Sequence, residues 1–490
     1  MTVRTATAAL ALAGATVLVP TANASADLAS QVSAEGANRH LIAFQRIADT
    51  HGGNRAAMTT GYDASVDYVA GRLREAGFDV TTPTFEVKRK VNDAGRIAVG
   101  GSAYDLIPFG DTPNAEGLTA PLRVVAEDGT PGCEASDFAG QDFTGSVALI
   151  RRGSCTFVTK YTNAVNAGAA AVIISNNADG PLDLRIPGKI PGAGVTKADG
   201  TALAAKAGQQ VTVELRHHDV VHLDRNVIAQ TRTGREDNVV MAGAHLDSVE
   251  AGPGMNDNGS GSAALLEIAL KMGARPGLPN AVRFTWWGAE EAGLVGSKAY
   301  AAGLTFEQQL DIALYLNFDM VGSPNPGYFV YNDPGLPYGS KHIEKAFTDY
   351  YNAKNLGPEG LNVRGASDYG SFTALGIPAG GIISGGGEVK TPAQAAKWGG
   401  TAGVEMDPCY HRACDHLGNI NREALGRNVA AAAHVIAAYG VTTEGVNGVP
   451  SRAERAVDQR RATASNRWLP TSNARPSVSP NSSTDANPAA

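Results

Sequence analysis

The feature that most constrains this 490-residue chain is an alternation of short apolar runs and helical stretches that begins at Asn226. Each run has the length of a buried strand. The runs are followed by Gly-rich or acidic loops and by stretches with helical periodicity. The runs lie at 227–230, 239–242, 282–286, 315–318 and 382–383, and the helices at 261–272 and 428–439. Such alternation is typical of a parallel sheet with helices on both faces. We therefore predict an α/β domain with a mixed, largely parallel sheet sandwiched by helices.

Residues 91–221 have a different texture, in which short apolar runs alternate with Gly, Pro and Asp turns. This spacing is typical of a compact β-rich unit, and helical periodicity adds one helix near 158–167. An amphipathic helix at 62–76, stopped by Gly77, and the start of a strand precede this unit. The β-rich unit is therefore predicted to be inserted into the α/β domain, which would comprise residues 27–90 and 222–440.

The two ends of the chain differ from the middle. Arg4, an apolar run at 8–19 and Ala24-Ser25-Ala26 follow the pattern of a secretory signal peptide, so residues 1–26 are predicted to be removed. The run is too short to cross roughly 30 Å of hydrocarbon, and no later stretch is long enough to do so. Residues 441–490 are rich in Ser, Pro, Asn, Ala and Arg, which predicts a disordered tail or removable extension. We expect a secreted protein without stable membrane insertion.

Charge and cysteine content narrow the possible roles. Forty-one Lys and Arg against 48 Asp and Glu leave a net charge of -7, which argues against a nucleic-acid-binding protein.

The four cysteines of an exported chain indicate disulfides, and their spacing favours Cys133–Cys155 and Cys409–Cys414. Four cysteines permit three connectivities, so this pairing is a preference. A Cys-based zinc site is the competing interpretation, but the sequence contains no Cys-x-x-Cys pair.

Five short segments carry His and acidic residues at the ends of predicted strands or in the loops that follow. They are His245-Leu246-Asp247-Ser248, Asn256-Asp257-Asn258-Gly259-Ser260-Gly261, Glu290-Glu291-Ala292-Gly293, Asn317-Phe318-Asp319-Met320 and Cys409-Tyr410-His411. Ligands collect at the carboxyl ends of strands in open α/β sheets, so these segments are expected to converge. Two imidazoles and three carboxylates suit a pair of metal ions that share one carboxylate. The ligand set is His245, Asp257, Glu291, Asp319 and His411.

Each segment has a plainer interpretation when it is taken alone. Asp257 fits a turn or a helix N-cap, the pair Glu290-Glu291 fits a solvated face, and His245 fits a satisfied core histidine. The joint occurrence in this order, each after an apolar run, carries the metal hypothesis. Glu290 is then left to act as a base on a metal-bound water.

The five segments resemble the signature set of the M28 metallopeptidases, which are co-catalytic di-zinc aminopeptidases, and most resemble the secreted leucine-type members from streptomycetes. The likeness covers about 226–439 and the helix at 62–76. It implies that His245 and Asp319 bind one zinc, that Glu291 and His411 bind the other, and that Asp257 bridges. It also implies a general base at Glu290, an orienting carboxylate at Asp247 and an oxyanion donor at Tyr410.

One departure from the family pattern concerns the loop that would contact the substrate. Some members carry an Arg beside the Ser-Asp of this loop, whereas Ser367-Asp368 follows Ala366 here, with Arg364 two places upstream of Ala366. The group that contacts the substrate terminus is therefore not assigned. The resemblance also allows a calcium ion, for which the sequence places no ligands.

The inserted unit is similar to a protease-associated (PA) domain. The likeness rests on Arg152-Gly153-Ser154-Cys155-Thr156-Phe157, on Lys160 and on the run at 166–174. The unit has no catalytic constellation of its own. The nearby His217, His218 and His222 fit a solvated strand or linker better than a metal site, and His416 fits a structural role.

These features predict a secreted, apolar-selective aminopeptidase with two zinc ions, acting as a monomer on peptide N-termini. The free α-amine is expected to lie against Glu290 and Asp319, and Trp286, Trp287 and Phe372 are candidates for an apolar pocket or for the core. Three alternatives remain: a carboxypeptidase, which needs a cationic cluster that the motifs lack; a single-zinc glutaminyl cyclase; and a non-catalytic binding protein that uses its PA domain.

Overall fold

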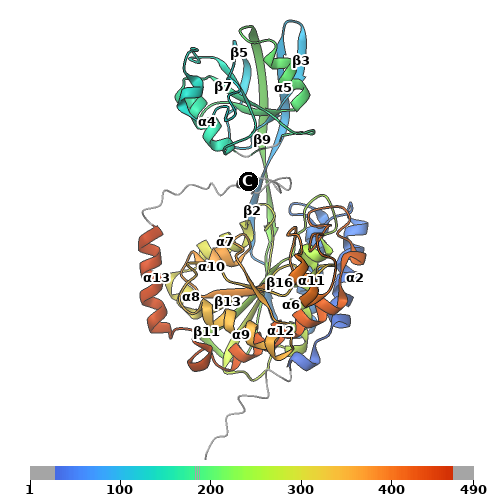
Figure 1. Ribbon diagram of the computed structural model, residues 1–490. Helices are drawn as coiled ribbons and strands as arrows, with labels where there is room; N and C mark the ends of the chain where they lie inside the picture. The colour runs from blue at the N-terminus through green and yellow to red at the C-terminus, as the bar shows by residue number, and fades with distance from the viewer. Residues whose placement is uncertain (1–27, 183, 185, 187, 467–490) are drawn as a thin grey trace, which may run out of the picture. The chain divides into compact units, whose positions relative to one another are not determined.

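The structure is a computed structural model that describes residues 28–466 apart from 183, 185 and 187. The predicted signal peptide and residues 467–490 lie outside the described residues. The chain divides into two compact units (Figure 1). Thr84–Asp224 form the bulk of one unit, and the other contains the chain up to Pro83, Arg225–Glu290 and Gly296–Ala464. Each unit has its own sheet.

The sheet of the larger unit has the strand order β1-β10-β12-β11-β13-β16-β14-β15. Its strands are β1 (Asp79–Thr81), β10 (Val227–Gln230), β11 (Arg235–His245), β12 (Asn280–Trp287), β13 (Ile312–Phe318), β14 (Phe329–Tyr331), β15 (Glu359–Leu361) and β16 (Ala379–Ile383). The central strands β12, β11, β13 and β16 are parallel, whereas β10 pairs with β12, and β14 with β16, in antiparallel fashion. The predicted mixed, largely parallel sheet is therefore confirmed.

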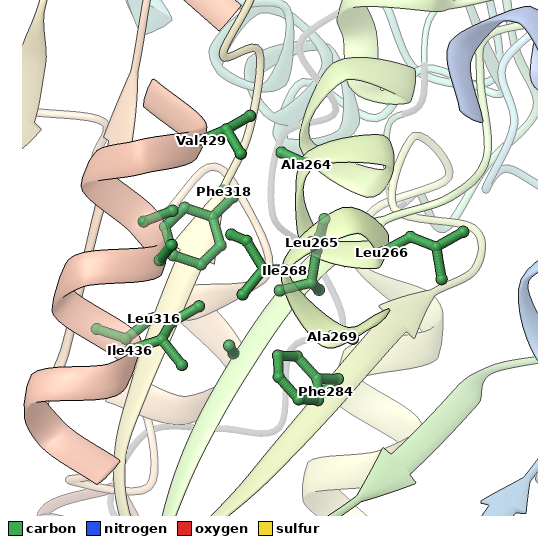
Figure 2. Packing of buried hydrophobic residues seen from close by; sticks show 14 of the residues in the cluster. Ala264, Leu265, Leu266, Ile268, Ala269, Phe284, Leu316, Phe318, Val429 and Ile436 are labelled. Atoms are coloured by element: carbon green, nitrogen blue, oxygen red, sulfur yellow. The ribbon is translucent and has the colours of Figure 1, made fainter. Parts of the chain in front are cut away.

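Helices cover both faces of this sheet, because alternate residues of each strand face opposite sides. The helices of this unit are α2 (Ala34–Thr50), α3 (Thr60–Glu75), α6 (Gly261–Met272), α7 (Val295–Gly303), α8 (Phe306–Asp311), α9 (Ser340–Ala353), α10 (Tyr369–Thr373), α11 (Pro392–Trp398), α12 (Arg422–Val441) and α13 (Arg452–Asn466), with short turns η2 (Met255–Ser260), η3 (Leu417–Asn419) and η4 (Gly445–Asn447). Val240 and Ala242 of β11 join a core with α2, α3, α6 and α12, whereas Met241 joins a second core with Phe372 of α10. Figure 2 shows Leu265 and Ile268 of α6 facing the α12 side of the first core.

Helix α3 confirms the predicted helix at 62–76. Thr59 caps its first turn by accepting a hydrogen bond from the Tyr62 N–H, and Gly77 follows its end with φ +85°. The left-handed backbone at Gly77 costs glycine little, so the chain can leave the helix there. Helix α2, by contrast, was not among the predicted elements. It begins after an N-cap at Ser33 and buries Leu41 and Phe44.

The smaller unit is also built on one sheet, of order β3-β2-β9-β5-β6-β7-β8-β4. Its strands are β2 (Thr84–Val99), β3 (Ser102–Asp105), β4 (Ile107–Pro108), β5 (Ala115–Val124), β6 (Val147–Arg151), β7 (Ala171–Ser175), β8 (Gly192–Val195) and β9 (Gln210–Arg225). Its helices are α4 (Phe157–Asn166), α5 (Lys197–Ala204) and the short η1 (Ala135–Phe138). Helix α4 confirms the predicted helix at 158–167. Both predicted disulfides are present, Cys133–Cys155 in this unit and Cys409–Cys414 in the larger one.

The prediction of disorder from residue 441 is wrong for residues 442–466. Helix α12 extends to Val441, and α13 follows it. Arg455 of α13 is buried and donates hydrogen bonds to the carbonyls of Pro450 and Leu310, at 2.8 and 2.9 Å. Arg452 lies 2.8 Å from Glu307 and 2.9 Å from Asp311. The segment is held by charged side chains on carbonyls and carboxylates, and a search for apolar periodicity does not detect such contacts.

Over the described residues, the search for helices long and apolar enough to cross a bilayer finds none.

Candidate metal centre

The predicted ligands lie at the carboxyl ends of three neighbouring parallel strands and in two adjoining loops. His245 is the last residue of β11, Glu290 and Glu291 follow β12, and Asp319 follows β13. Asp257 lies in η2, just before α6, and His411 lies in the loop closed by the Cys409–Cys414 disulfide. Because parallel strands end at the same edge of the sheet, residues that are far apart in sequence meet there.

The two imidazoles share one carboxylate. His245 Nε2 lies 3.3 Å from Asp257 Oδ1, and His411 Nε2 lies 2.9 Å from Asp257 Oδ2. His245 Nε2 also lies 3.3 Å from Asp319 Oδ1. Asp257 therefore offers one oxygen to each imidazole.

Three sets of side chains place one ligand atom each within 4.8 Å of one another. The sets are His245, Asp257 and Asp319; Asp257, Glu291 and His411; and His245, Glu290 and Glu291. The first two sets share Asp257, which is the arrangement that a bridged pair of metal ions requires.

The chemistry of this donor set fits a divalent cation. Asp319 Oδ1 is buried and has no hydrogen-bond partner among the described residues, although its other oxygen accepts from Ser367 Oγ at 2.7 Å. Burial alone would lower the pKa of His245, but the neighbouring carboxylates, Asp319 and Glu290 foremost, outweigh it and raise this pKa well above its ordinary value. Burial would likewise raise the pKa of Asp257, yet the two imidazoles lower it. Imidazole and carboxylate ligands without thiolates suit Zn²⁺.

Asp247 contacts both ligand-bearing loops beside it. Its main-chain carbonyl lies 3.1 Å from His245 Nδ1, whereas its carboxylate oxygen Oδ1 is 3.6 Å from the same nitrogen. That carboxylate oxygen accepts a hydrogen bond from the Glu290 N–H at 3.1 Å. The closer contact to the imidazole is thus through the carbonyl, and the carboxylate contacts the loop that carries Glu290.

Asp319 is connected to the core by a chain of hydrogen bonds. Ser367 Oγ, which donates to Asp319, accepts from Asn317 Nδ2 at 2.9 Å, and Asn317 Oδ1 accepts from Tyr315 OH at 3.1 Å. Trp287 Nε1 donates to Tyr315 OH at 2.8 Å. Since each member is buried, the chain fixes the rotamer of the carboxylate from behind.

The aromatic candidates for a substrate pocket belong to the core. Trp286, Trp287 and Phe372 are fully buried. Trp286 Nε1 donates to the Ser262 carbonyl at 3.1 Å, and Phe372 stacks on Tyr315 with ring centroids 4.2 Å apart. The structure therefore supports a role for these residues in the hydrophobic core and not in an apolar substrate pocket.

Tyr410 lies at the exposed side of the centre. Its side chain is 38% exposed, and its ring stacks on that of His411 at 3.9 Å. The Cys409–Cys414 disulfide closes the short loop that carries both residues. The phenol is thus near a ligand and open to solvent, as a group that contacts substrate must be.

Arg55 was not anticipated from the sequence. It is fully buried, and its guanidinium donates to the carbonyls of Leu246, Pro253 (3.0 Å) and Gly254 (2.7 Å). Burial lowers the pKa of Arg55 to about 10, although Asp247, Asp415 and Asp257 act in the opposite direction. Arg55 therefore holds together the two ends of the loop 246–254, which connects β11 to η2, where Asp257 lies. It stands in a short polar loop without periodicity, so no sequence signal marked it.

Two buried carboxyl groups near the centre were also outside the predicted set. Burial raises the pKa of Asp368 to about 7 and that of Asp415 to about 7. Asp368 adjoins Ser367 in the substrate loop, and Asp415 adjoins Cys414. Both were visible in the sequence only as neighbours of motif residues.

Four further histidines make hydrogen bonds outside the candidate metal centre. His217, His218 and His222 of β9 contact the Thr112 carbonyl, Asp93 and Asp224 respectively, at 2.8, 2.8 and 2.7 Å. Within the described chain, none of the three belongs to a group of three potential metal ligands. His416 caps η3 by accepting from the Gly418 N–H at 3.0 Å.

Comparisons with known proteins agree with these observations. Residues 226–436 match peptidase family M28, and residues 118–203 match the PA domain. A probable lipoprotein aminopeptidase of Mycobacterium tuberculosis, LpqL, is 44% identical over 448 residues, which cover 87% of this chain and 89% of the relative. A probable leucine aminopeptidase 2 of Aspergillus fumigatus is 39% identical over 412 residues, or 80% of each chain.

Solved structures show the same architecture. BSAP, a zinc aminopeptidase from Bacillus subtilis, has a TM-score of 0.65 and 26% identity, with 86% of this chain and 98% of that chain covered. The M28 and PA resemblances inferred from the motifs are thereby confirmed. This chain belongs to peptidase family M28 and is one of the aminopeptidases of that family that carry a PA domain.

Proposed function

We propose that this chain is a two-zinc aminopeptidase that removes single apolar residues, leucine foremost, from the free N-termini of peptides. The observation that carries the proposal is the shared carboxylate of Asp257, whose two oxygens face His245 and His411. In the proposed ligand set, His245 and Asp319 hold one zinc, Glu291 and His411 hold the other, and Asp257 bridges. The preference for leucine rests on relatives such as the probable leucine aminopeptidase 2.

When bound, zinc would polarise the scissile carbonyl and lower the pKa of a water from about 15.7 towards neutrality. Glu290 is proposed as the base that takes the proton of the attacking water and returns it to the leaving amine. The bond from the Glu290 N–H to Asp247 fixes the main chain of this residue, so its carboxylate is held beside the ligands. Glu290 is thus proposed as the base and Glu291 as a zinc ligand, although the two residues are adjacent in the chain.

Tyr410 is proposed as the hydrogen-bond donor to the oxygen that becomes negative in the tetrahedral state. Its exposure at the edge of the centre supports this role. The carboxylates of Glu290 and Asp319 would face the free α-ammonium of the substrate, so a blocked N-terminus would lose these contacts. This acidic environment favours a substrate amine over a substrate carboxylate.

Export is part of the proposal. The signal-peptide pattern in residues 1–26 and two disulfides support a location outside the reducing cytoplasm. The relative LpqL is a probable lipoprotein aminopeptidase. The enzyme is proposed to act as a monomer. Ligands for a calcium ion are not part of this proposal.

The test uses leucine p-nitroanilide with and without an N-acetyl cap. It compares wild type, Glu290→Gln, and wild type stripped by chelator and reloaded with zinc, with metal content measured for each. We expect cleavage of the free amine only, at least a 10³-fold loss in Glu290→Gln at unchanged zinc content, and recovery on reloading. Glu307→Gln is the matched control, because Glu307 is an exposed carboxylate paired with Arg452.

Two results would contradict the proposal. Inactivity on a panel of free-amine substrates despite two bound zinc ions would refute the peptidase assignment of the centre. A protein that takes up no zinc would refute the ligand set.

A further inference from the structure

We propose that Asp415 is a positioning residue of the metal centre, which aligns the bridging carboxylate by holding the main chain at Asp257. This inference rests on the proposed ligand set. Asp415 Oδ2 accepts hydrogen bonds from the N–H groups of Asn256 at 3.1 Å and Asp257 at 3.0 Å. Its other oxygen lies 2.9 Å from the Asn256 nitrogen. The carboxylate thus contacts the peptide group of the bridging residue itself.

Asp415 also joins the two loops that supply ligands to one metal position. It follows Cys414 directly, so it is adjacent to the disulfide-closed loop that carries His411. Its main-chain carbonyl accepts from the Met255 N–H at 3.0 Å. A Cβ built on Gly252 would lie 2.5 Å from the Arg412 carbonyl oxygen, which shows how closely the two loops approach. A shift of one loop therefore moves both Asp257 and His411.

Two buried side chains hold the loop that carries Asp257, one through its carbonyls and the other through its N–H groups. Arg55 donates to the carbonyls of Pro253 and Gly254, and Asp415 accepts from the N–H groups of Asn256 and Asp257. Both side chains are buried, and a hydrogen bond is stronger in the protein interior than in water. This pairing fixes the backbone more firmly than ordinary loop contacts would.

Fixing the backbone matters because a bridging ligand must serve two ions at once. Asp257 places one oxygen on each side, and a small rotation brings one oxygen closer only by withdrawing the other. Supporting residues around a metal ligand typically change affinity or activity about 10–100-fold when they are mutated. We therefore expect Asp415 to act through Asp257, without contact to substrate or metal.

Asp415→Asn tests this directly, because the amide is isosteric but keeps only one accepting oxygen. Asn419 Nδ2 and the Asn256 N–H donate to Asp415 Oδ1 at 3.0 and 2.9 Å, so the new NH₂ group meets a donor in either orientation of the amide. Asp333→Asn is the matched control. Asp333 is also buried and accepts two backbone N–H groups, from Val363 at 2.6 Å and Gly365 at 3.0 Å, and neither is a ligand residue.

The measurement is titration of zinc into the chelator-treated full chain, followed by the absorption spectrum of the Co²⁺-loaded protein. We expect wild type and Asp333→Asn to bind zinc alike, and Asp415→Asn to bind at least about tenfold more weakly, with an altered Co²⁺ spectrum. At saturating zinc, kcat of Asp415→Asn should fall while KM stays near the wild-type value. A purely structural role would lower the melting temperature of both variants without changing the spectrum.

The outcomes separate this inference from the proposed function. If wild type fails to bind two zinc ions, the ligand set is wrong. If wild type binds two and Asp415→Asn binds equally tightly with an unchanged spectrum, Asp415 does not position the bridge. Should Asp415→Asn not fold, Asp415→Glu keeps the charge but displaces the oxygens by about one bond length, and the same spectral change is expected. An unchanged Co²⁺ spectrum in Asp415→Glu would overturn the inference as well.

Discussion

The two units of this protein use the same polar residue types in opposite ways. In the larger unit, His245 is buried and lies 3.3 Å from two different carboxylates, each from a separate loop. In the smaller unit, His218 is 54% exposed and contacts a single carboxylate that is 45% exposed. Both regions contain histidines next to aspartates, but among the described residues His245 belongs to groups of three potential metal ligands and His218 does not.

The difference lies in convergence and burial rather than in composition. Strand ends of a parallel sheet bring several loops to one place, and the surrounding core excludes the water that would otherwise solvate the charges. Strand β9 presents its histidines along its own length, so each meets a different partner, the Thr112 carbonyl for His217 and Asp93 for His218. A carboxylate shared by two imidazoles is the feature that separates the two regions.

Asp257→Asn removes that feature and should give the largest effect. The amide keeps one oxygen and places an NH₂ group, which does not bind a metal ion, where the second zinc needs an oxygen ligand. We expect kcat/KM on leucine p-nitroanilide to fall at least 10³-fold, about 4 kcal/mol in transition-state stabilisation, with less than two zinc ions bound. Asp93→Asn, which changes the partner of His218, is the control and should match wild type. Equal zinc content in wild type and Asp257→Asn would contradict the bridging role.

Much of the larger unit could be predicted from the sequence because its elements follow local rules. The apolar runs at 239–242 and 315–318 became β11 and β13, and the proposed ligands stand directly after such runs. The sheet order brings the ends of these strands together. The motifs found in the sequence therefore already contain the residues of the candidate site.

The supporting residues could not be predicted in the same way. Arg55 contacts the carbonyl of Gly254, 199 positions away, and backbone carbonyls have no residue identity that a motif could carry. Helix α13 is attached through Arg452 and Arg455, and composition alone indicated disorder there. In both cases a charged side chain binds main chain or distant carboxylates, and only the folded structure shows these contacts.

His40 provides a buried histidine without a metal role, and its effect appears in stability. It is 4% exposed, its Nδ1 lies 2.8 Å from Tyr68 OH, and its Nε2 lies 3.8 Å from Glu267. Burial foremost, together with Arg72 and Arg39, lowers its pKa to about 4. The unfolded chain therefore binds this proton near its ordinary pKa, and the folded chain does not.

The sign of the pH dependence follows. The stabilising contribution of neutral His40 is fully present above pH ~6.5 and is lost as pH falls towards ~4. This loss lowers the free energy of unfolding by at most about 3 kcal/mol. In His40→Gln, the free energy of unfolding measured in urea should fall less steeply over this pH range than it does in wild type. Glu267, whose pKa is raised by burial, acts with the opposite sign and is present in both proteins, so it cancels in the comparison. A decline equally steep in His40→Gln would show that other groups cause it.

Arg55→Lys should give a smaller effect on catalysis than Asp257→Asn. Lysine keeps the charge, but its single ammonium cannot reach the three carbonyls that the planar guanidinium contacts. We expect kcat/KM to fall about tenfold at saturating zinc, because the two ends of the loop between His245 and Asp257 are less firmly held together. Arg225→Lys is the matched control: Arg225 pairs with Asp63 and Asp67 at more exposed positions. Similar losses in both variants would mean that the position of the arginine does not matter.

His218→Gln should give the smallest effect, and it tests whether convergence is the right criterion. Exposed ion pairs contribute about 0–1 kcal/mol, so the melting temperature and kcat/KM should stay close to wild type. The informative measurement is zinc stoichiometry. If β9 only carries solvated histidines, wild type and His218→Gln bind the same number of ions. A zinc ion that wild type binds and His218→Gln loses would show that an exposed His–Asp pair on one strand suffices for metal binding, and burial at converging strand ends would then no longer distinguish the two units.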